Sequence, residues 1–424
     1  MSRTLLEKPL LKLVLLFGLI IFDGYRVLIG TSFSLKPFLV IAVLLILWTS
    51  FRRLYVPLNF RLFILWFLSL FIPLIFGTVL STSQFVVIIF GQALLTLFLL
   101  AFHNFLILRQ VKLEDIFDAI IFLGVFTAAI GFLQVVLFFL GLNVGVSHFE
   151  DVGVPRPESF FSETDWHAMF VGYCLLASLF INEKSRFNII KKQINLFLLL
   201  SLITSFGRTA IAGALASYLV HLMLFYPLPK LMARAVKFLV IAVPIFILLL
   251  PVLPESIVSR FDIVGNIEDP ELDAGAINSR VFAIQMTIAF IEENPLTGNG
   301  AGSLNYLANN DDIKAEFSYG GGINSGRGGT NIFLTSLFDS GILGLLVMVI
   351  LLTGILISGY RYAKKKSNDY QYFFQFCLLS NIYFLVECQA NNMIRTPIVW
   401  VNFALFTYAV YLFHTDKKIS QGAV

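Results

Sequence analysis

The chain has 424 residues, of which 58% are hydrophobic and 13% are charged, and its formal net charge is +4. A mean hydropathy of +0.85 leaves too little polar surface for a soluble globular protein of this length. Apolar runs long enough to cross about 30 Å of hydrocarbon recur along the whole sequence. The composition therefore excludes a soluble enzyme and predicts an integral membrane protein.

These runs are apolar on every side, as in 239–253, whereas the strands of a membrane barrel alternate apolar and polar residues. The sequence therefore predicts an all-α polytopic membrane protein with about twelve transmembrane helices. The spans are expected near residues 10–30, 35–50, 60–80, 85–107, 116–141, 164–182, 189–206, 208–226, 237–253, 333–358, 370–390 and 396–413. The seventh and eighth should meet in a very tight turn at Ser205–Arg208.

The distribution of Lys and Arg predicts the orientation of these spans. Twenty-one of the 30 cationic residues fall in alternate loops, which the positive-inside rule assigns to the cytoplasm together with both termini. The other nine fall on the outer side, mostly in the loops 142–163 and 254–332. The larger loop carries eleven acidic residues against four cations, and we expect it to form a small folded cap.

Two further features restrict the prediction. No small-residue cleavage site follows the first apolar run, which therefore reads as a retained first helix. The three cysteines all lie within predicted spans, and their spacing indicates neither a metal site nor a disulfide framework.

Four arginines precede or open helices that are expected to run inward from the outer face: Arg156, Arg208, Arg327 and Arg395. Such helices present their free N–H groups and the positive end of their dipole at that face. Guanidinium groups bind phosphate oxygens through paired hydrogen bonds, so a diphosphate is a natural ligand. The alternative for each arginine is contact with lipid headgroups or a role in local structure.

The cap is expected to contain one amphipathic helix. It should run from Arg280, after a cap at Asn278 or Ser279, to about Asn294, where Pro295 ends it. Arg280 would then lie in its first turn, free to bind an anion or to pair with a loop carboxylate. We interpret the glycines at 298–302 as a turn, and those at 320–329 as a mobile flap or a disordered segment.

Acid and base candidates are few outside the predicted membrane segments. Glu163 and His167 lie four residues apart on one helical face near Arg156, which makes them the first and second candidates. The segment Ser162–Asp165 also resembles a capping box, which would explain Asp165 without a functional role.

The order of these motifs resembles the O-antigen ligase and polymerase family of bacterial envelope glycan enzymes, of the Wzy and WaaL type. Three segments carry the resemblance, namely SFGRTAIAGALASYL at 205–219, SRVFAIQMTIAFIEENPLTGNGAGS at 279–303 and TNIFLTSLFDSGILGLL at 330–346. It covers roughly residues 160–360, which would form the core together with the periplasmic loop. Residues 1–159 and 361–424 would supply the flanking helices of a GT-C-like fold.

The resemblance implies an inverting, metal-independent glycosyltransferase without a cofactor, in the bacterial inner membrane. Its donor would be an undecaprenyl-diphosphate-linked glycan on the periplasmic face, and its acceptor a glycan or a lipid-linked group. Membrane lipids and a chain-length regulator would be further partners, and nucleic acid would not. By position, Arg208 and Arg280 match the family arginines that hold the diphosphate, with Arg156, Arg327 and Arg395 as additional binding residues.

One position departs from the family pattern. Asn331 matches the residue after the family histidine, but Thr330 stands where ligases often carry that histidine. Glu163 resembles an acidic position found in some polymerases. We therefore expect a polymerase that joins glycan repeats, with a ligase that transfers glycan to lipid A core or another acceptor as the alternative. A lipid-linked oligosaccharide transporter and a membrane scaffold are the alternatives of other classes.

Overall fold

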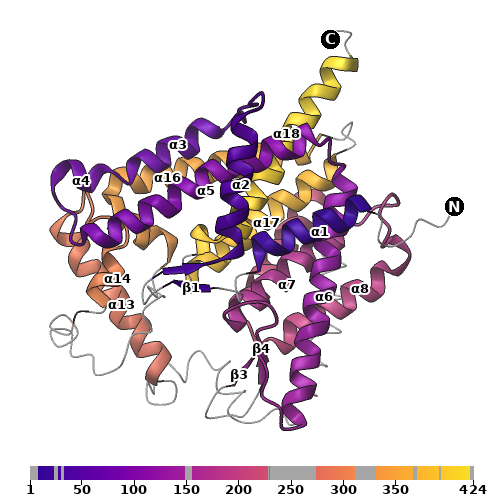
Figure 1. The fold of residues 1–424 in the computed structure, drawn as a ribbon, viewed down its shortest axis with the longest axis horizontal. Helices are drawn as coiled ribbons and strands as arrows, with labels where there is room; N and C mark the ends of the chain where they lie inside the picture. The colour runs from indigo at the N-terminus through magenta and orange to yellow at the C-terminus, as the bar shows by residue number, and fades with distance from the viewer. Residues whose placement is uncertain are drawn as a thin grey trace.

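The computed structural model describes residues 8–22, 27–29, 33–148, 155–227, 229, 274–308, 310, 331–365, 370–390 and 393–420. Helices make up most of this part of the chain (Figure 1). Its strands form two antiparallel hairpins, β1 (Val27–Ile29) with β2 (Phe33–Leu35) and β3 (Val146–His148) with β4 (Pro155–Pro157).

A helix lies in every predicted span that the structure describes. The helices are α1 (Lys8–Ile21), α2 (Pro37–Ser50), α3 (Phe60–Ser69), α4 (Ile72–Phe76), α5 (Thr82–Leu108), α6 (Leu113–Phe139), α7 (Thr164–Leu179), α8 (Lys191–Thr204), α9 (Arg208–Phe225), α13 (Ala274–Glu293), α14 (Ser303–Ala308), α16 (Ile332–Ala363), α17 (Gln371–Ala390) and α18 (Pro397–Ser420), with 3-10 turns η1 (Asn188–Ile190) and η4 (Met393–Arg395). The span expected at 237–253 lies outside the described residues.

Five of these helices are long and apolar enough to cross a membrane, judged by length and composition. They are Thr82–Leu108, Leu113–Phe139, Arg208–Phe225, Ile332–Ala363 and Pro397–Asp416. The chain is thus a helical membrane protein, as expected. Its twelve crossings and the side on which its termini lie stay predictions.

Two predicted spans are shorter or more broken than expected. The first helix ends at Ile21, and residues 27–29 pair with residues 33–35 as strands instead of continuing the span. The third span breaks into α3 and α4, because Pro73 in the first turn of α4 lacks the N–H group needed to continue a helix.

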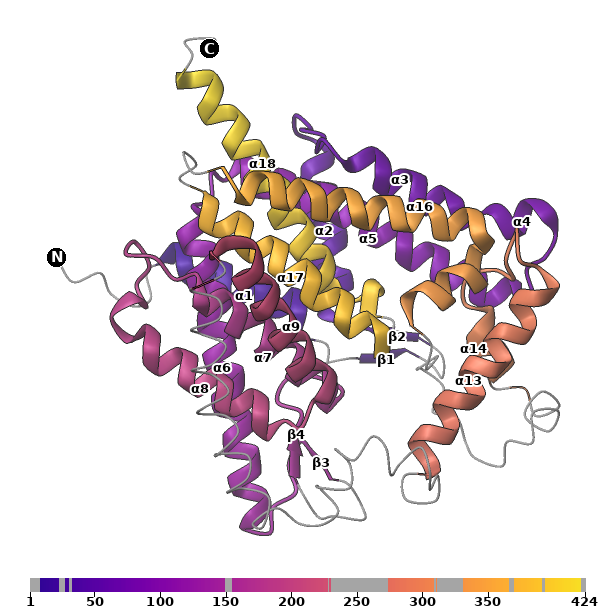
Figure 2. The same ribbon diagram turned by 180° about the vertical axis from the view of Figure 1, so that it is seen from behind.

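Two groups of helices make up the bundle. Helix α6 packs against α1, α7 and α8, whereas α5 packs against α2, α3 and α18. Helix α17 lies between the groups, in contact with α7 and α9 on one side and with α16 and α18 on the other (Figures 1 and 2). One large apolar core runs through both groups.

The tight turn between the seventh and eighth spans is confirmed. Helix α8 ends at Thr204 and α9 begins at Arg208, with Phe206 in the left-handed region at φ 52°. A Cβ on Gly207 would lie 2.4 Å from the Cβ of Ala168, so only glycine allows this turn to pack against α7.

The cap helix α13 begins at Ala274, six residues before the predicted start, and ends at Glu293 as Pro295 predicts. Arg280 is therefore the seventh residue of the helix, not part of its first turn. Met286 is buried with Leu304, Leu307 and Phe338. Helix α13 thus packs onto α14 and α16 at one end of the bundle (Figure 2).

Candidate functional site

Arg156 of β4 joins three segments at one end of the bundle. Its Nη2 donates a hydrogen bond to Asp165 Oδ1 over 2.6 Å, and its side chain is only 12% exposed. Its Nε donates to the backbone oxygen of Ser205 over 3.2 Å. One guanidinium therefore links β4, the first turn of α7 and the turn between α8 and α9.

This ion pair gives Asp165 a charged partner in addition to the capping box predicted at Ser162–Asp165, which stays a prediction. The residue that caps α7 is Glu163, and its side chain makes no capping hydrogen bond. Asp165 lies in the first turn of α7 and pairs with Arg156. The predicted start of the helix is confirmed, and the carboxylate of Asp165 makes a charge-assisted hydrogen bond with the guanidinium.

Arg208 is the first residue of α9, and its side chain is exposed. The N-cap residue is Gly207, which has no side chain with which to cap the helix. The first backbone bond of the helix runs from the N–H of Ile211 to the oxygen of Gly207 over 3.0 Å. The N–H groups before Ile211 therefore have no partner within the helix, and they lie beside a guanidinium, which favours an anion.

Glu387 of α17 lies next to this helix start, and sequence reasoning did not single it out. Its carboxyl is within hydrogen-bonding reach of the hydroxyls of Thr209 and Tyr383, and near enough to Asp165 to feel its charge. Glu387 is 1% exposed, and its Oε1 has no hydrogen-bond partner. An acidic residue inside an apolar helix was the available signal, since such residues are costly and often functional.

Tyr383, one turn before Glu387, locks three helices together. Its hydroxyl donates to the backbone oxygen of Met169 in α7 over 3.0 Å. A Cβ on Gly172 of α7 would lie 2.4 Å from that hydroxyl, and a Cβ on Gly213 of α9 would lie 2.9 Å from the ring. The two glycines therefore form the space into which the tyrosine of α17 fits.

The loop before α7 carries two carboxyl groups that influence each other. Burial, and then the charge of Glu163, raise the pKa of the Glu158 carboxyl above its usual value. Both residues are half-buried. Glu163, the first predicted base, thus lies at the start of α7 beside a second acid. That acid, Glu158, was not among the residues singled out from the sequence.

His167, the second predicted base, is wholly buried in α7. Neither ring nitrogen has a hydrogen-bond partner, so its ring and Glu163 do not bond to each other. A Cβ on Gly131 of α6 would lie 2.9 Å from the ring. The ring fills the space beside that glycine, and its role as a base stays a prediction.

A second group of site residues surrounds a break in α16. Ser340 and Gly341 have non-helical backbone angles, with Gly341 at φ 65°. The glycine-rich turn after α13 inserts here through three backbone hydrogen bonds: Asn299 N–H to Phe338 oxygen at 2.7 Å, Gly300 N–H to Asp339 oxygen at 3.2 Å and Ile342 N–H to Pro295 oxygen at 3.0 Å. The prediction that the glycines at 298–302 form a turn is confirmed, and the turn holds the cap to the bundle.

Asp339 at this break is 3% exposed and pairs with Arg395 of η4, whose Nη2 lies 2.5 Å from its Oδ2. Asn331 caps α16 by accepting a hydrogen bond from the N–H of Leu334 over 2.8 Å. Arg395 and Asn331 thus each have a structural partner. Because η4 packs against α17, the helix that carries Glu387, this group adjoins the one around Arg208.

Two predicted residues cannot be placed in either group. Arg280 lies within α13, but its side chain is outside the described residues, and so is the whole of Arg327. The flap expected at 320–329 and Thr330 also lie outside them. The convergence of Arg208 and Arg280 on one pocket therefore stays a prediction.

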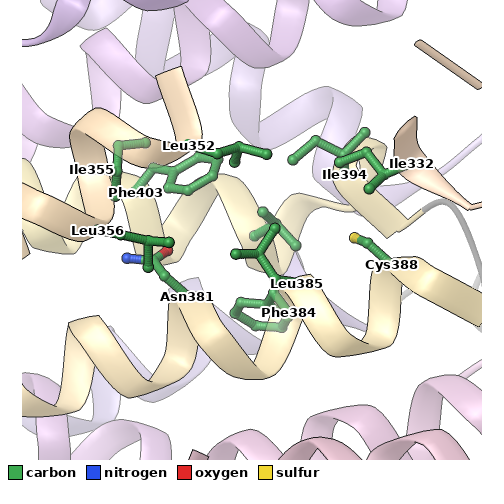
Figure 3. Close-up of a pocket in the computed structure, with 11 residues that line it drawn as sticks. Ile332, Leu352, Ile355, Leu356, Asn381, Phe384, Leu385, Cys388, Ile394 and Phe403 are labelled. Atoms are coloured by element: carbon green, nitrogen blue, oxygen red, sulfur yellow. The ribbon is translucent and has the colours of Figure 1, made fainter. Parts of the chain in front are cut away.

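A small cavity between α16, α17 and α18 is almost wholly apolar (Figure 3). Its volume is about 10 Å³, too small for a ligand, and its one amide, Asn381, accepts a hydrogen bond from Asn402 over 2.9 Å. We regard it as a packing gap. Among the described residues, no three His, Cys, Asp or Glu side chains are grouped so as to hold a metal ion.

Fold and site together define a helical membrane protein that gathers arginines and carboxylates at the ends of several helices. Residues 193–349 match the family model described as O-Antigen ligase, and this match supports membership of the O-antigen ligase and polymerase family. A comparison with curated proteins gave no match. The matched segment contains Arg208, Arg280 and the break in α16, whereas Glu163 and His167 precede it.

Proposed function

We propose that the chain is a membrane glycosyltransferase that takes its donor glycan from undecaprenyl diphosphate on the periplasmic face and joins glycan repeats into a polymer. The observation that supports this most is the start of α9. There the exposed Arg208 and the N–H groups of the first turn lie within the segment that matches the family. Buried Glu387 of α17, outside that segment, lies beside them.

In this proposal, the acceptor hydroxyl attacks the anomeric carbon of the donor sugar from the side opposite the diphosphate. The new C–O bond forms as the bond to the phosphate oxygen breaks, which inverts the configuration. The departing diphosphate gains negative charge, and Arg208, the N–H groups of α9 and Arg280 would offset it. Glu163, the first predicted base, would accept the hydroxyl proton, with Glu158 beside it as an alternative acceptor.

Arg156 has a supporting role in this scheme. It holds Asp165 and the turn before α9, so it fixes the position from which Arg208 projects. Arg395 likewise holds the break in α16 through Asp339. Both arginines would therefore act on the substrate mainly through the geometry they maintain.

The test is reconstitution of the purified protein with a synthetic lipid-diphosphate glycan. Arg208→Ala should lower the rate of chain elongation by about 10² to 10³, the usual loss when one preorganised donor is removed. Arg61→Ala, at an exposed arginine in the first turn of α3, is the matched control and should elongate normally. Equal rates in Arg208→Ala and the wild type would remove the assigned role.

The same assay separates the alternatives. A ligase would attach the glycan once to a lipid A core acceptor without lengthening it, and the description of the matched family as a ligase favours this as the second candidate. A carrier would move the lipid-linked glycan across the vesicle membrane without forming any new glycosidic bond.

A further inference from the structure

A cavity of about 550 Å³ opens at the end of the bundle away from Arg156 and Arg208. It lies where α6 begins and α18 ends, lined by residues of 107–114 and 408–415 together with Tyr55, Lys184 and Tyr370. Asp165 of the candidate site lies in the first turn of α7, whereas Lys184 of the cavity follows the last turn of the same helix. Since α7 has 16 residues and is therefore about 24 Å long, the cavity and the candidate site lie near opposite ends of this helix.

This cavity, which we name the α6 pocket, is formed by loops that the sequence assigns to one side of the membrane. Tyr55, Lys112, Lys184 and Tyr370 come from four separate loops, all predicted to be cytoplasmic from their content of Lys and Arg. Their meeting at one cavity agrees with that assignment. The pocket would then open at the headgroup level of the cytoplasmic leaflet.

The charges at the α6 pocket favour an anion that also has polar groups. Lys112, the N-cap residue of α6, is exposed, and the helix start has no side-chain cap. Lys184 is 73% exposed, and its Nζ lies 3.8 Å from Glu114 Oε1, a distance at which an anion can readily displace this contact. Asp416 near the rim already accepts a hydrogen bond from Tyr370.

Further cations and aromatic rings surround the mouth of the pocket. The guanidinium of Arg53 lies over the ring of lining residue Tyr55 at 5.6 Å, and that of Arg109 lies over Trp48 at 5.4 Å. Tyr55 also contacts Tyr411 edge-on, with ring centroids 5.6 Å apart. Tyrosine, tryptophan and cations in this arrangement are typical of the membrane interface.

One hydrogen bond joins the two segments that line the pocket, and part of the lining is apolar. The hydroxyl of Tyr408 donates to the backbone oxygen of Val111 over 2.6 Å, which ties α18 to the loop before α6. Ile107, Leu108 and Leu412 supply apolar lining. A ligand with a phosphate, hydroxyl groups and attached hydrocarbon would match all of these surfaces at once.

We propose that the α6 pocket binds the headgroup of an anionic glycerophospholipid, with Lys112 and Lys184 on its phosphate and its acyl chains along Leu108 and Leu412. Basic pockets between transmembrane helices on the cytoplasmic side bind such headgroups in membrane proteins generally. The site is distinct from the one proposed for glycan transfer, and it does not depend on that function.

The test uses the full-length protein purified in a neutral detergent, with bound lipid counted by native mass spectrometry and affinity measured by titration. Phosphatidylglycerol should bind more tightly than phosphatidylcholine. The double variant Lys112→Gln/Lys184→Gln should weaken phosphatidylglycerol about thirty-fold, since each lysine near a lipid phosphate contributes about five-fold. Lys192→Gln, at an exposed lysine of α8 that does not line the pocket, should bind like the wild type.

Three outcomes would overturn the proposal. The first is equal binding of the two lipids, and the second is full retention of phosphatidylglycerol by the double variant. The third is that inorganic phosphate or glycerol phosphate binds as tightly as phosphatidylglycerol. The last would make the pocket a site for soluble phosphates. If the double variant fails to fold, Lys184→Gln alone gives the same test with an expected effect of about five-fold, because this side chain is largely exposed.

Discussion

Replacing Gly341 by alanine should detach the glycine-rich turn from α16. A Cβ at this position would lie 2.1 Å from the backbone oxygen of Leu296 and 2.6 Å from the backbone nitrogen of Thr297. Neither is a side-chain atom that can rotate away, so the two segments must separate. The residue also has φ +65°, which costs an alanine about 1–2 kcal/mol.

The size of the effect follows from what separation would break. Three backbone hydrogen bonds join residues 295–300 to 338–342, and each contributes about 1 kcal/mol net. With the backbone strain, the total loss of stability for the cap should be about 3–6 kcal/mol. Hydrogen exchange of the amides of Asn299 and Ile342 should rise accordingly, and glycan transfer should fall with it.

Two other glycines serve as controls. Gly77 has φ +72°, but the space that its Cβ would occupy is open, so Gly77→Ala should cost only the strain, about 1–2 kcal/mol. Gly91 lies within α5, and a Cβ there would meet no atom within 4 Å, so Gly91→Ala should gain about 1 kcal/mol from helix propensity. If amide exchange in Gly341→Ala matched that of Gly77→Ala, the turn would not be held by this close backbone approach.

Three further predictions concern charged groups. Arg395→Ala should lower the free energy of unfolding by about 3 kcal/mol, because it leaves buried Asp339 without its counter-ion; Asp339→Asn added to it should recover part of the loss, and unchanged thermal stability of the single variant would contradict this. Glu387→Gln should keep or raise the melting temperature by removing a buried negative charge, yet slow glycan transfer at least about ten-fold; normal turnover would make Glu387 purely structural. Glu158 has a raised pKa in the folded protein, so its ionisation opposes folding as pH rises from its usual value of 4.5 through the raised one. Glu158→Gln should therefore stabilise the protein at pH 7 but not at pH 4, unlike Glu183→Gln at an exposed carboxyl, and equal effects at both pH values would refute the assignment.

The positions of the helices could be predicted because hydrophobicity depends on residue type alone. The sequence signals for the turn at Ser205–Arg208 and for the end of α13 before Pro295 are also local. They come from a glycine and a proline, which each determine what their own backbone can adopt. The start of α13 was misplaced because a polar residue that can cap a helix also fits inside one. Asn278 and Ser279 lie within α13.

The partners of the charged residues could not be predicted in the same way. Arg156 was expected to face a ligand, but its nearest carboxylate is brought to it by the hairpin and the start of α7. Asp339 and Arg395 are 56 residues apart in the chain, and only the packing of η4 joins them. Glu387 was missed because a single acidic residue in an apolar run shows nothing of its neighbours until α9 and α17 are placed side by side.

The fit of Tyr383 between Gly172 and Gly213 limits how this membrane protein can move. Three helices that share one interlocked side chain cannot slide past each other without withdrawing it, so α7, α9 and α17 should shift as a single block. Asp165, Arg208 and Glu387 then keep their spacing throughout a reaction cycle. Helices α13 and α14 pack on α16 outside this block, so we expect any rearrangement that admits a glycan substrate to occur there.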